Sequence, residues 1–438
     1  MAMHAEEFSL ARYVDAVGRA DTLPLQGRVL RVVGLLIESE GPRARLGEVC
    51  DVLSDGAEAL PVQVVGFRGG TLLTVPLGDL AGIRPGDRIV ARQGAISVGV
   101  GPQLLGRVVD ALGRPLDGLP LRTTARVPLH PPPLNPMQRD SVSTPLPSGV
   151  KAIDGLLTCG RGQRLGLFGG SGVGKSTLLG MMTRGTAADV IVMALVGERG
   201  REVRSFLDHD LGPAGLERSI VVVSTSDNPP LLRMRAAYTA TSIAEYFRDQ
   251  GKHVLLLMDS VTRFAMAQRE VGLAAGEPPT TKGYPPSVFA ALPSLLERAG
   301  GVRGRGSITA AYTVLVDGDD HNEPIADAVR SILDGHIVLS RELAQRHHYP
   351  PIDVLQSVSR TMPDVVDVTH RRQAGVVRDW MAAIRDSEDL VNVGAYVEGS
   401  SPRIDAARSR QQTIETFLRQ EADSLCPFTD TVEALQAL

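Results

Sequence analysis

The chain has 438 residues, of which 43% are hydrophobic and 22% are charged, and its formal net charge is −4. This length predicts about three domains with sizeable cores, and the small negative charge argues against a general nucleic-acid footprint. No apolar run reaches the ~18 residues of a membrane helix, and the N-terminus lacks the basic and apolar regions of a signal peptide. The three cysteines (Cys50, Cys159, Cys426) are far apart, which argues against disulfides and a zinc site and indicates a reducing cytoplasm.

Residues 1–22 have the pattern of a short amphipathic helix. Leu10, Tyr13, Val14 and Val17 recur at the spacing of one helical face. We therefore expect an N-terminal helical appendage.

Residues 23–96 are rich in short apolar runs broken by glycine and acidic residues. The runs are GRVLRVVG, ALPVQVVG, TLLTVP and DRIVAR, with turn signals such as Gly69-Gly70. Strands this short with turns this frequent predict a small β-barrel. The proline-rich segment 127–148 further along has no periodicity and predicts an extended connector.

The longest expected domain is residues 97–365, and from about residue 150 it alternates strand and helix patterns. The expected strands are Arg164–Phe168, Asp189–Val196, Ser219–Ser224, His253–Asp259, Ile308–Val316 and His336–Ser340. The clearest helix is Arg233–Gln250, followed by Gly251 as a stop signal. Such alternation predicts a parallel sheet covered by helices on both faces. Residues 366–438 show helical patterns at Val376–Ile384 and Ile404–Leu425 and predict a C-terminal helical domain.

One motif carries specific chemistry, the pattern G-x-x-x-x-G-K-[ST] between the strand RLGLF and a helix that begins near Thr177. Its residues are Gly169, Gly170, Ser171, Gly172, Val173, Gly174, Lys175 and Ser176. Glycines let backbone N–H groups surround phosphate oxygens, the lysine reaches the β- and γ-phosphates, and the serine hydroxyl ligates Mg²⁺. The motif predicts a site for ATP and Mg²⁺ that includes Thr177.

A magnesium-bound triphosphate also needs an acidic group at the end of a neighbouring strand. The run HVLLLMDS supplies Asp259 where that strand should meet solvent. A strand that ends in aspartate is also a common structural feature. Paired with the phosphate loop, Asp259 is predicted to bind Mg²⁺.

Hydrolysis requires a group that orients water. The strand VIVMALV ends at Gly197-Glu198-Arg199-Gly200-Arg201-Glu202. We assign Glu198 to water activation, Arg199 to the phosphate charge and Glu202 to the outer shell of the metal. The alternative is a solvated helix N-terminus, where the helix dipole favours acids.

These residues together resemble the catalytic subunits of the rotary ATPase family and its type III protein-export branch. The resemblance extends through GPQLLGRVVDALGRPLDG, GVKAIDGLLTCGRGQRLGLFGGSGVGKSTLL, VGERGREV, GEPPTTKGYPPSVFA and DGDDHNEPIAD. The segments PPPLNPMQRD and MDSVTRFAMAQRE are closest to the flagellar export ATPases, with the injectisome ATPases as near relatives. The resemblance implies a central RecA-like P-loop domain between the small β-barrel and the helical domain.

The resemblance also implies roles that spacing cannot show. Arg360 in SVSR matches the arginine that reaches the neighbouring subunit's γ-phosphate, although alone it would be read as a surface arginine. Tyr349 in HHYPP looks like the aromatic that stacks on adenine, Tyr396 in GAY is a second candidate for that pocket, and Arg263 matches a site arginine. The acids of the loop 317–323 match a segment that faces a central shaft; they are Asp317, Asp319, Asp320 and Glu323.

By this resemblance we expect a Mg²⁺-dependent ATPase, a homohexamer with sites at subunit interfaces, that energises flagellar type III export. The implied partners are a stator-like dimer at the N-terminus, a central stalk, a membrane export gate and substrate–chaperone complexes, at the cytoplasmic face of the inner membrane. The alternatives are an injectisome ATPase, a proton-translocating synthase catalytic subunit and a regulatory subunit without turnover. A nucleic-acid motor is disfavoured because the barrel region lacks stacking aromatics, so no nucleic-acid partner is expected.

Overall fold

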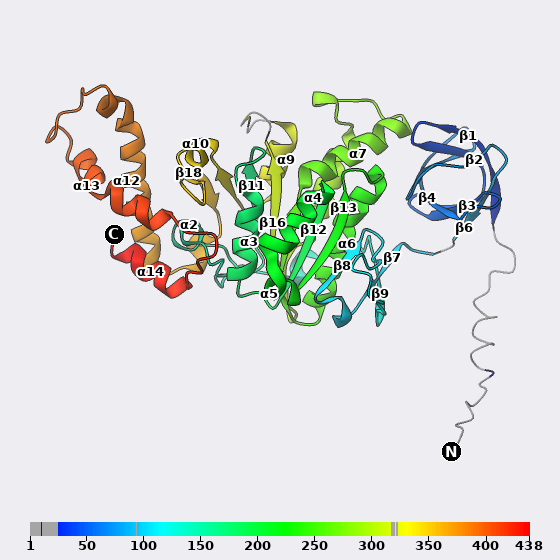
Figure 1. Cartoon of the computed structure of the whole chain (residues 1–438), viewed down its shortest axis with the longest axis horizontal. Coiled ribbons are helices and arrows are strands. Elements are labelled where there is room, and N and C mark those ends of the chain that lie inside the picture. Colours follow the sequence, from blue (N-terminus) through cyan, green and yellow to red (C-terminus); the bar gives the residue numbers. More distant parts are fainter. Residues whose placement is uncertain (1–9, 11–24, 93, 317–319, 321–322) are drawn as a thin grey trace, which may run out of the picture. The chain divides into compact units, whose positions relative to one another are not determined.

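The computed structural model describes residues 10, 25–92, 94–316, 320 and 323–438. The chain folds as two compact units, an N-terminal unit, Met1–Ala95, and a C-terminal unit, Ile96–Leu438 (Figure 1). The helix expected in residues 1–22 lies outside the described residues, apart from Leu10.

The N-terminal unit is a closed β-barrel with strand order β1-β2-β5-β4-β3-β6. Its strands are β1 Gln26–Val33, β2 Leu36–Glu40, β3 Val49–Leu53, β4 Leu60–Arg68, β5 Thr71–Pro76 and β6 Arg88–Ala91. The barrel closes where β1 pairs with β6, with Gly27 opposite Ile89. Alternate apolar residues point inward because successive side chains of a strand face opposite sides. The core contains Val29, Ile37, Cys50, Val52, Val62, Val64, Leu72, Ile89 and Ala91. The expected small barrel is confirmed.

The C-terminal unit is built on one large sheet, mostly parallel, with order β18-β17-β11-β16-β14-β12-β13-β8. Its strands are β8 Arg107–Asp110, β11 Arg164–Gly169, β12 Val190–Glu198, β13 Ser219–Thr225, β14 His253–Asp259, β16 Ser307–Leu315, β17 Gly335–Leu339 and β18 Ile352–Ser359. Two short strands, β10 Arg139–Asp140 and β15 Gly300–Val302, extend the sheet off this path, and β7 Ser97–Val100 pairs with β9 Ala125–Pro128. The strand β18 runs antiparallel to β17 at the edge.

Helices cover both faces of this sheet. They are α2 Lys151–Leu156, α3 Lys175–Gly185, α4 Gly200–Ser205, the π-helix η3 Phe206–Leu211, α5 Gly212–Glu217, α6 Pro230–Asp249, α7 Val261–Ala275, α8 Pro286–Leu296, α9 Pro324–Ile332, α10 Arg341–Gln345 and α11 Met362–Val365. Short 3₁₀ turns lie at η1 Pro102–Leu104, η2 Pro136–Gln138 and η4 Thr281–Gly283. On β12, Ile191 and Met193 pack with Leu178 of α3, while α6 contacts the same strand. Because alternate residues face opposite sides, α3 and α6 lie on opposite faces.

Three helices form the C-terminal end of this unit: α12 Val368–Asn392, α13 Pro402–Leu418 and α14 Phe428–Gln436 (Figure 1). All three contact α2. Phe417, Leu418 and Leu435 are buried in the same apolar cluster as Ile153 of α2. The expected helical region is therefore confirmed, and it is anchored to the sheet domain through α2.

Some element boundaries differ from the sequence prediction. The helix expected at 404–425 ends at Leu418, and α14 is a separate helix. The strands β8 and β18 were not predicted. In β18 the polar residues Asp353, Gln356 and Ser357 interrupt the apolar pattern. Buried Asp353 is tolerated because its carboxylate accepts hydrogen bonds from the backbone N–H groups of Leu355 and Gln356.

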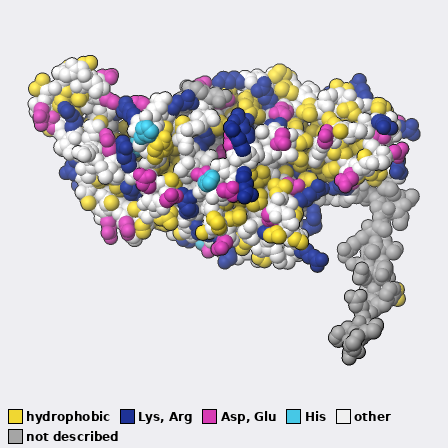
Figure 2. Space-filling view, viewed as in Figure 1, with side chains coloured by type: hydrophobic (Ala, Val, Ile, Leu, Met, Phe, Trp, Pro, Cys, Tyr) yellow, Lys and Arg dark blue, Asp and Glu magenta, His cyan; other side chains and the backbone are white. Residues whose placement is uncertain are grey.

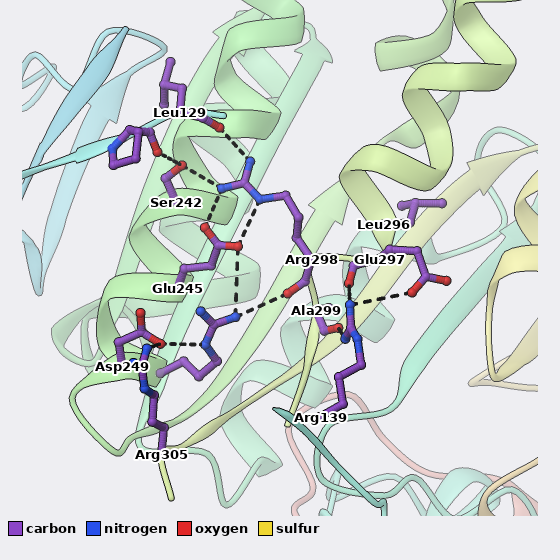
Figure 3. Close-up of polar contacts among 12 residues, drawn as sticks. Leu129, Arg139, Ser242, Glu245, Asp249, Leu296, Glu297, Arg298, Ala299 and Arg305 are labelled. Atoms are coloured by element: carbon purple, nitrogen blue, oxygen red, sulfur yellow. Dashed lines mark hydrogen bonds and ion pairs between the residues drawn. The ribbon is translucent and has the colours of Figure 1, made fainter. Parts of the chain in front are cut away.

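The proline-rich connector is held against α6 by a polar network (Figure 3). The guanidinium of Arg298 donates to the carbonyl oxygen of Leu129 at 2.8 Å, to Ser242 Oγ at 2.9 Å and to Glu245 Oε1 at 3.0 Å. Arg139, later in the connector, donates to the carbonyl oxygen of Ala299 at 2.9 Å. Both Arg298 and Glu245 are nearly buried. Mutual pairing of these charges is therefore needed to offset their loss of hydration.

Among the described residues, no helix is long and apolar enough to cross a membrane. Acidic and basic side chains are interspersed on the coloured part of the face shown in Figure 2. The described part of that face therefore has no broad field of one sign of the kind that would attract a polyanion.

Candidate active site

The phosphate loop joins the end of β11 to the start of α3. Gly172 and Gly174 have positive φ values of 77° and 92°, which L side chains rarely adopt. This conformation turns the chain so that α3 begins at Lys175 and its unpaired backbone N–H groups face the loop. The structure therefore places the motif between a strand and a helix, as the sequence predicts.

Lys175 lies inside this loop and is 8% exposed. Its Nζ donates to the carbonyl oxygens of Gly169, at 3.1 Å, and of Gly170. Burial lowers the pKa of Lys175, while the nearby carboxylates of Asp259 and Glu198 oppose this shift. The Lys175 ammonium thus lies in the loop that a phosphate would enter. It is held there by hydrogen bonds to neutral carbonyl oxygens, which a phosphate can replace.

Asp259 ends β14 and lies at the base of the same site, 7% exposed. One carboxylate oxygen accepts a hydrogen bond from Thr313 Oγ1 of the adjacent strand β16 at 2.5 Å. Burial raises the pKa of Asp259, and Thr313, Lys175 and Arg263 act in the opposite direction. The structure therefore holds this carboxylate in a fixed orientation at the carboxyl end of the sheet.

Glu198 ends the neighbouring strand β12 and faces the same space. Burial raises the pKa of Glu198 to about 8, and the negative charge of Asp259 and the hydrogen bond with Glu202 add to this effect. Converging carboxyl groups of this kind are stabilised when a cation binds among them. The site has the electrostatics of a cation-binding site that also contains one carboxyl group of high pKa.

Arg199 and Glu202 lie at the start of α4, where Arg199 is the N-cap residue. Their side chains pair at 3.5 Å and are 65% and 44% exposed. Such an exposed pair contributes little to stability, so both side chains can rearrange at low cost. Glu202 is next to Glu198, as the spacing of four residues predicts.

Arg263, on the first turn of α7, packs over the end of β12. Gly197 has a φ of 73°, and a Cβ there would lie 3.1 Å from Arg263 Cβ. Arg263 Nε is buried and has no hydrogen-bond partner among the residues that the structure describes. A buried donor of this kind is costly unless a ligand or water satisfies it.

These side chains surround a cavity of about 530 Å³. Its lining includes Ser171, Gly172, Gly174, Lys175, Ser176, Thr177, Glu198, Arg199, Glu202, Asp259, Arg263 and Glu323. The described residues contain no cluster of three or more His, Cys, Asp or Glu side chains that could hold a metal by themselves. One hydroxyl and one or two carboxylates suit Mg²⁺, which keeps waters and takes phosphate oxygens as its other ligands.

Other predicted residues lie outside this cavity. Arg360 follows β18 at the end of the sheet opposite to the phosphate loop. Its backbone N–H donates to the carbonyl oxygen of Asp334, and its Nη1 donates to the carbonyl oxygen of Leu333 at 3.3 Å. Tyr349 is 47% exposed in the loop before β18. Tyr396 lies between α12 and α13, where its hydroxyl donates to Asp405 Oδ1 at 2.8 Å. The structure therefore does not bring Tyr396 to the phosphate loop.

The acidic loop is described only in part. Asp317 and Asp319 lie outside the described residues. Asp320 pairs with Lys282 at 3.3 Å, and Glu323 lines the cavity beside the phosphate loop. Glu323 thus lies closer to the nucleotide site than the sequence comparison suggested.

Sequence reasoning missed several residues of the site. Thr313 is the clearest, because its contact with Asp259 depends on the pairing of β16 with β14. Phe206, Leu195 and Met266 form apolar parts of the cavity lining. Their sequence pattern is that of ordinary core residues, so only the folded arrangement identifies them.

Comparison with protein families gives two matches. Residues 149–359 match the nucleotide-binding domain of the ATP synthase alpha/beta family. Residues 366–437 match the C-terminal domain of the type III secretion ATPase EscN. The second match begins at the residue where the sequence analysis starts the helical domain.

Individual relatives match over nearly the full length. A flagellum-specific ATP synthase of Pseudomonas aeruginosa is 53% identical, with 96% of this chain and 95% of the relative covered. A type 3 secretion system ATPase of Sinorhizobium fredii is 52% identical, with 94% and 92% covered.

Solved structures of a type III secretion ATPase are also similar to this chain over nearly its full length. The assembled ATPase EscN of the enteropathogenic E. coli type III secretion system matches with a TM-score of 0.89 and 45% identity, covering 93% of this chain and 98% of the other. EscN in complex with its central stalk EscO matches with a TM-score of 0.86 and the same identity and coverage.

Proposed function

Because the chain belongs to the family of flagellum-specific ATPases, with the type 3 secretion ATPases as close relatives, we propose that it hydrolyses Mg²⁺-bound ATP at the interfaces of a homohexamer. Hydrolysis there energises flagellar type III protein export. The chain is an ATPase of the ATP synthase alpha/beta family.

The observation that carries the proposal is the separation of Arg360 from the phosphate loop of its own chain. Asp334, whose carbonyl accepts from Arg360, also donates its backbone N–H to the carbonyl of Arg164 at the start of β11. The phosphate loop begins at the other end of that strand, at Gly169. Five residues of extended strand span about 17 Å, farther than an arginine side chain reaches. Arg360 is therefore available to a neighbouring copy rather than to its own site.

The nucleotide is held mainly by the phosphate loop. The backbone N–H groups between Gly170 and Thr177 surround the phosphates, and the Lys175 ammonium leaves its carbonyl partners to contact the β- and γ-phosphates. Ser176 and Asp259 are the residues that would hold Mg²⁺, and Glu202 would act on the metal through a water. The metal supplies charge neutralisation between the phosphates.

Glu198 orients the attacking water. Its position at the end of β12, beside Asp259 and in the lining of the same cavity as the phosphate loop, suits a group that lies beyond the γ-phosphate. The raised pKa of Glu198 is expected to fall once a cation binds nearby. The carboxylate then accepts a hydrogen bond from water, while Arg199 and the neighbour's Arg360 stabilise the phosphate charge.

Tyr349 is proposed to stack on the adenine. The loop that carries it lies beside the phosphate loop, because a Cβ on Gly174 would be 3.9 Å from Pro351 Cδ. The ring is half-exposed and available for a base. The Tyr396 hydroxyl donates to Asp405 Oδ1 and to the carbonyl oxygen of Ser401, and its part in the adenine pocket stays a prediction.

The partners follow from the family. EscN has been solved as an assembled ATPase and in complex with its central stalk EscO. By analogy we propose a homohexamer around a central stalk. The acidic loop of each copy, with Asp317, Asp319 and Asp320, is proposed to face this stalk, while Glu323 at the end of the loop lines the nucleotide cavity. A stator-like dimer is proposed to bind residues 1–22, and the ring to act at the cytoplasmic face of the inner membrane with the export gate and substrate–chaperone complexes.

Replacement of the interface arginine tests this function. Arg360→Ala should lower kcat by about 10³-fold or more while ATP binding to the phosphate loop is retained. Arg372→Ala, an exposed arginine on α12, serves as the matched control. Undiminished turnover of the Arg360→Ala protein would contradict the proposal.

A further inference from the structure

The loop that carries Tyr349 is held by the C-terminal helical domain as well as by its own strand. On one side, the backbone N–H of Ser340 donates to the carbonyl oxygen of Pro351 at 2.8 Å. The Tyr349 hydroxyl donates to the carbonyl oxygen of Ala344 at 3.3 Å. The first contact fixes the end of the loop at Pro351, and the second ties the Tyr349 ring to α10. The carbonyl oxygen of Tyr349 is held by another element.

That element is the segment directly after α13. The backbone N–H of Gln420 donates to the carbonyl oxygen of Tyr349 at 2.9 Å. The neighbouring Arg419 Nη1 donates to the carbonyl oxygen of His347 at 3.2 Å. Two successive residues of the helical domain therefore hold the backbone of the loop at the predicted adenine contact.

Gln420 is itself fixed by its side chain, and it is 8% exposed. Its Nε2 donates to the carbonyl oxygens of Gly149 and Ser424, both at 2.7 Å, and its Oε1 accepts from the backbone N–H of Lys151 at 2.9 Å. Both amide hydrogens and the amide oxygen thus have partners. Because α13 ends at Leu418, Gln420 lies beyond the helix. The hydrogen bonds of its side chain therefore fix its position in place of helical hydrogen bonds.

We propose that Gln420 is a positioning residue for the nucleotide base: its buried amide fixes the backbone that orients Tyr349. This inference rests on the proposed stacking of Tyr349 on adenine. Gln420 is not among the described residues that line the phosphate cavity. The inference therefore concerns base affinity and leaves the chemical step to the residues of the cavity.

The test replaces the amide with a group of similar length that cannot make these hydrogen bonds. Gln420→Met is expected to raise the Kd and KM for ATP about fivefold to tenfold, within the range of one base–aromatic stack, with little change in kcat. Affinity for inorganic tripolyphosphate, which uses only the phosphate loop, should not change. Gln412→Met, at an exposed position on α13, is the matched control and should behave as wild type. Gln420→Asn, which shortens the amide by one methylene, is used if the methionine variant does not fold.

A double-mutant cycle with Tyr349→Ala separates this inference from the proposed function. If Gln420 acts through Tyr349, Gln420→Met should add no further loss of ATP affinity in the Tyr349→Ala protein. An unchanged ATP affinity in Tyr349→Ala would overturn the adenine role itself. A loss in Tyr349→Ala together with wild-type affinity in the Gln420 variant would overturn only the positioning role. Equal losses for ATP and tripolyphosphate would show that Gln420 supports the fold in general and would also overturn it.

Discussion

The backbone N–H of Arg360 donates to the carbonyl oxygen of Asp334 at 3.0 Å, at the end of the sheet opposite to the phosphate loop. The strand β18 runs antiparallel to β17, and so its last residues lie beside the start of β17 and β11. One chain therefore contains both halves of the proposed active site but keeps them apart. This arrangement explains how identical copies can complete one another's sites.

Glu198→Gln should lower kcat by about 10²-fold or more and leave ATP binding intact, because the amide cannot accept a proton or polarise water as a carboxylate does. Single-turnover phosphate release and equilibrium ATP binding measure the two effects. Glu202→Gln provides the comparison, since loss of an outer-shell group should mainly raise the Mg²⁺ concentration needed for half-maximal rate. Phosphate release at the wild-type rate in Glu198→Gln would support a regulatory subunit without turnover.

Thr313→Val should raise the Mg²⁺ concentration needed for half-maximal activity by about tenfold, because the Thr313 hydroxyl orients the Asp259 carboxylate. The loss of this hydrogen bond also raises the pKa of Asp259 further. Titration of the ATPase rate with Mg²⁺ measures the effect. Thr313→Ser keeps the hydroxyl and should restore the wild-type curve; equal curves for valine and serine would exclude the orienting role.

Gly197→Ala should reduce both stability and turnover. The new methyl group would combine a strained backbone with a 3.1 Å contact to Arg263, which must then move away from Glu198. We expect a loss of about 1–3 kcal/mol in the free energy of unfolding together with a lower kcat. Gly251→Ala is the control, because Gly251 also has a positive φ of 81° but has open space around its Cβ position. The control should lose stability through backbone strain alone and keep its kcat.

The buried Asp154 predicts a pH dependence of stability. Burial raises the pKa of Asp154 from 3.8 to about 6, and hydrogen bonds donated by Ser148 and Gly149 oppose this shift only in part. Between these values the unfolded chain is ionised while the folded chain still binds the proton, so stability falls as pH rises from about 4 to 6 and then levels off. The total loss is about 3 kcal/mol.

Denaturant unfolding at several pH values tests this dependence against Asp154→Asn. The asparagine amide does not titrate, so the difference in stability between the two proteins changes with pH only through the titration of Asp154. Wild type should lose about 2 kcal/mol relative to the variant between about pH 4.5 and pH 7. Parallel profiles for the two proteins would mean that Asp154 does not titrate in this range.

The parts of the site that could be predicted from the sequence are those set by local structure. The phosphate loop is one continuous motif, and Asp259 and Glu198 follow directly from the ends of apolar strands. Arg360 and Tyr349 were predicted only from the resemblance, because their proposed roles depend on another copy and on a loop far along the chain.

The features that the sequence did not predict depend on tertiary contacts. The contact between Thr313 and Asp259 depends on strand order, and the contact between Gln420 and Tyr349 joins two domains. The strand β18 was missed because Asp353 and Ser357 find partners only in the folded state. Such polar residues carry no periodic signal in the sequence.

The most direct test of interface catalysis mixes two inactive proteins, Glu198→Gln and Arg360→Ala, and measures ATPase activity after they assemble together. An interface that combines the cavity of an Arg360→Ala copy with the arginine of a Glu198→Gln copy is complete. Random assembly of equal amounts should restore activity at about a quarter of the interfaces. Recovery toward this level is the result predicted here, whereas mixtures as inactive as either protein alone would contradict an active site shared between neighbouring copies.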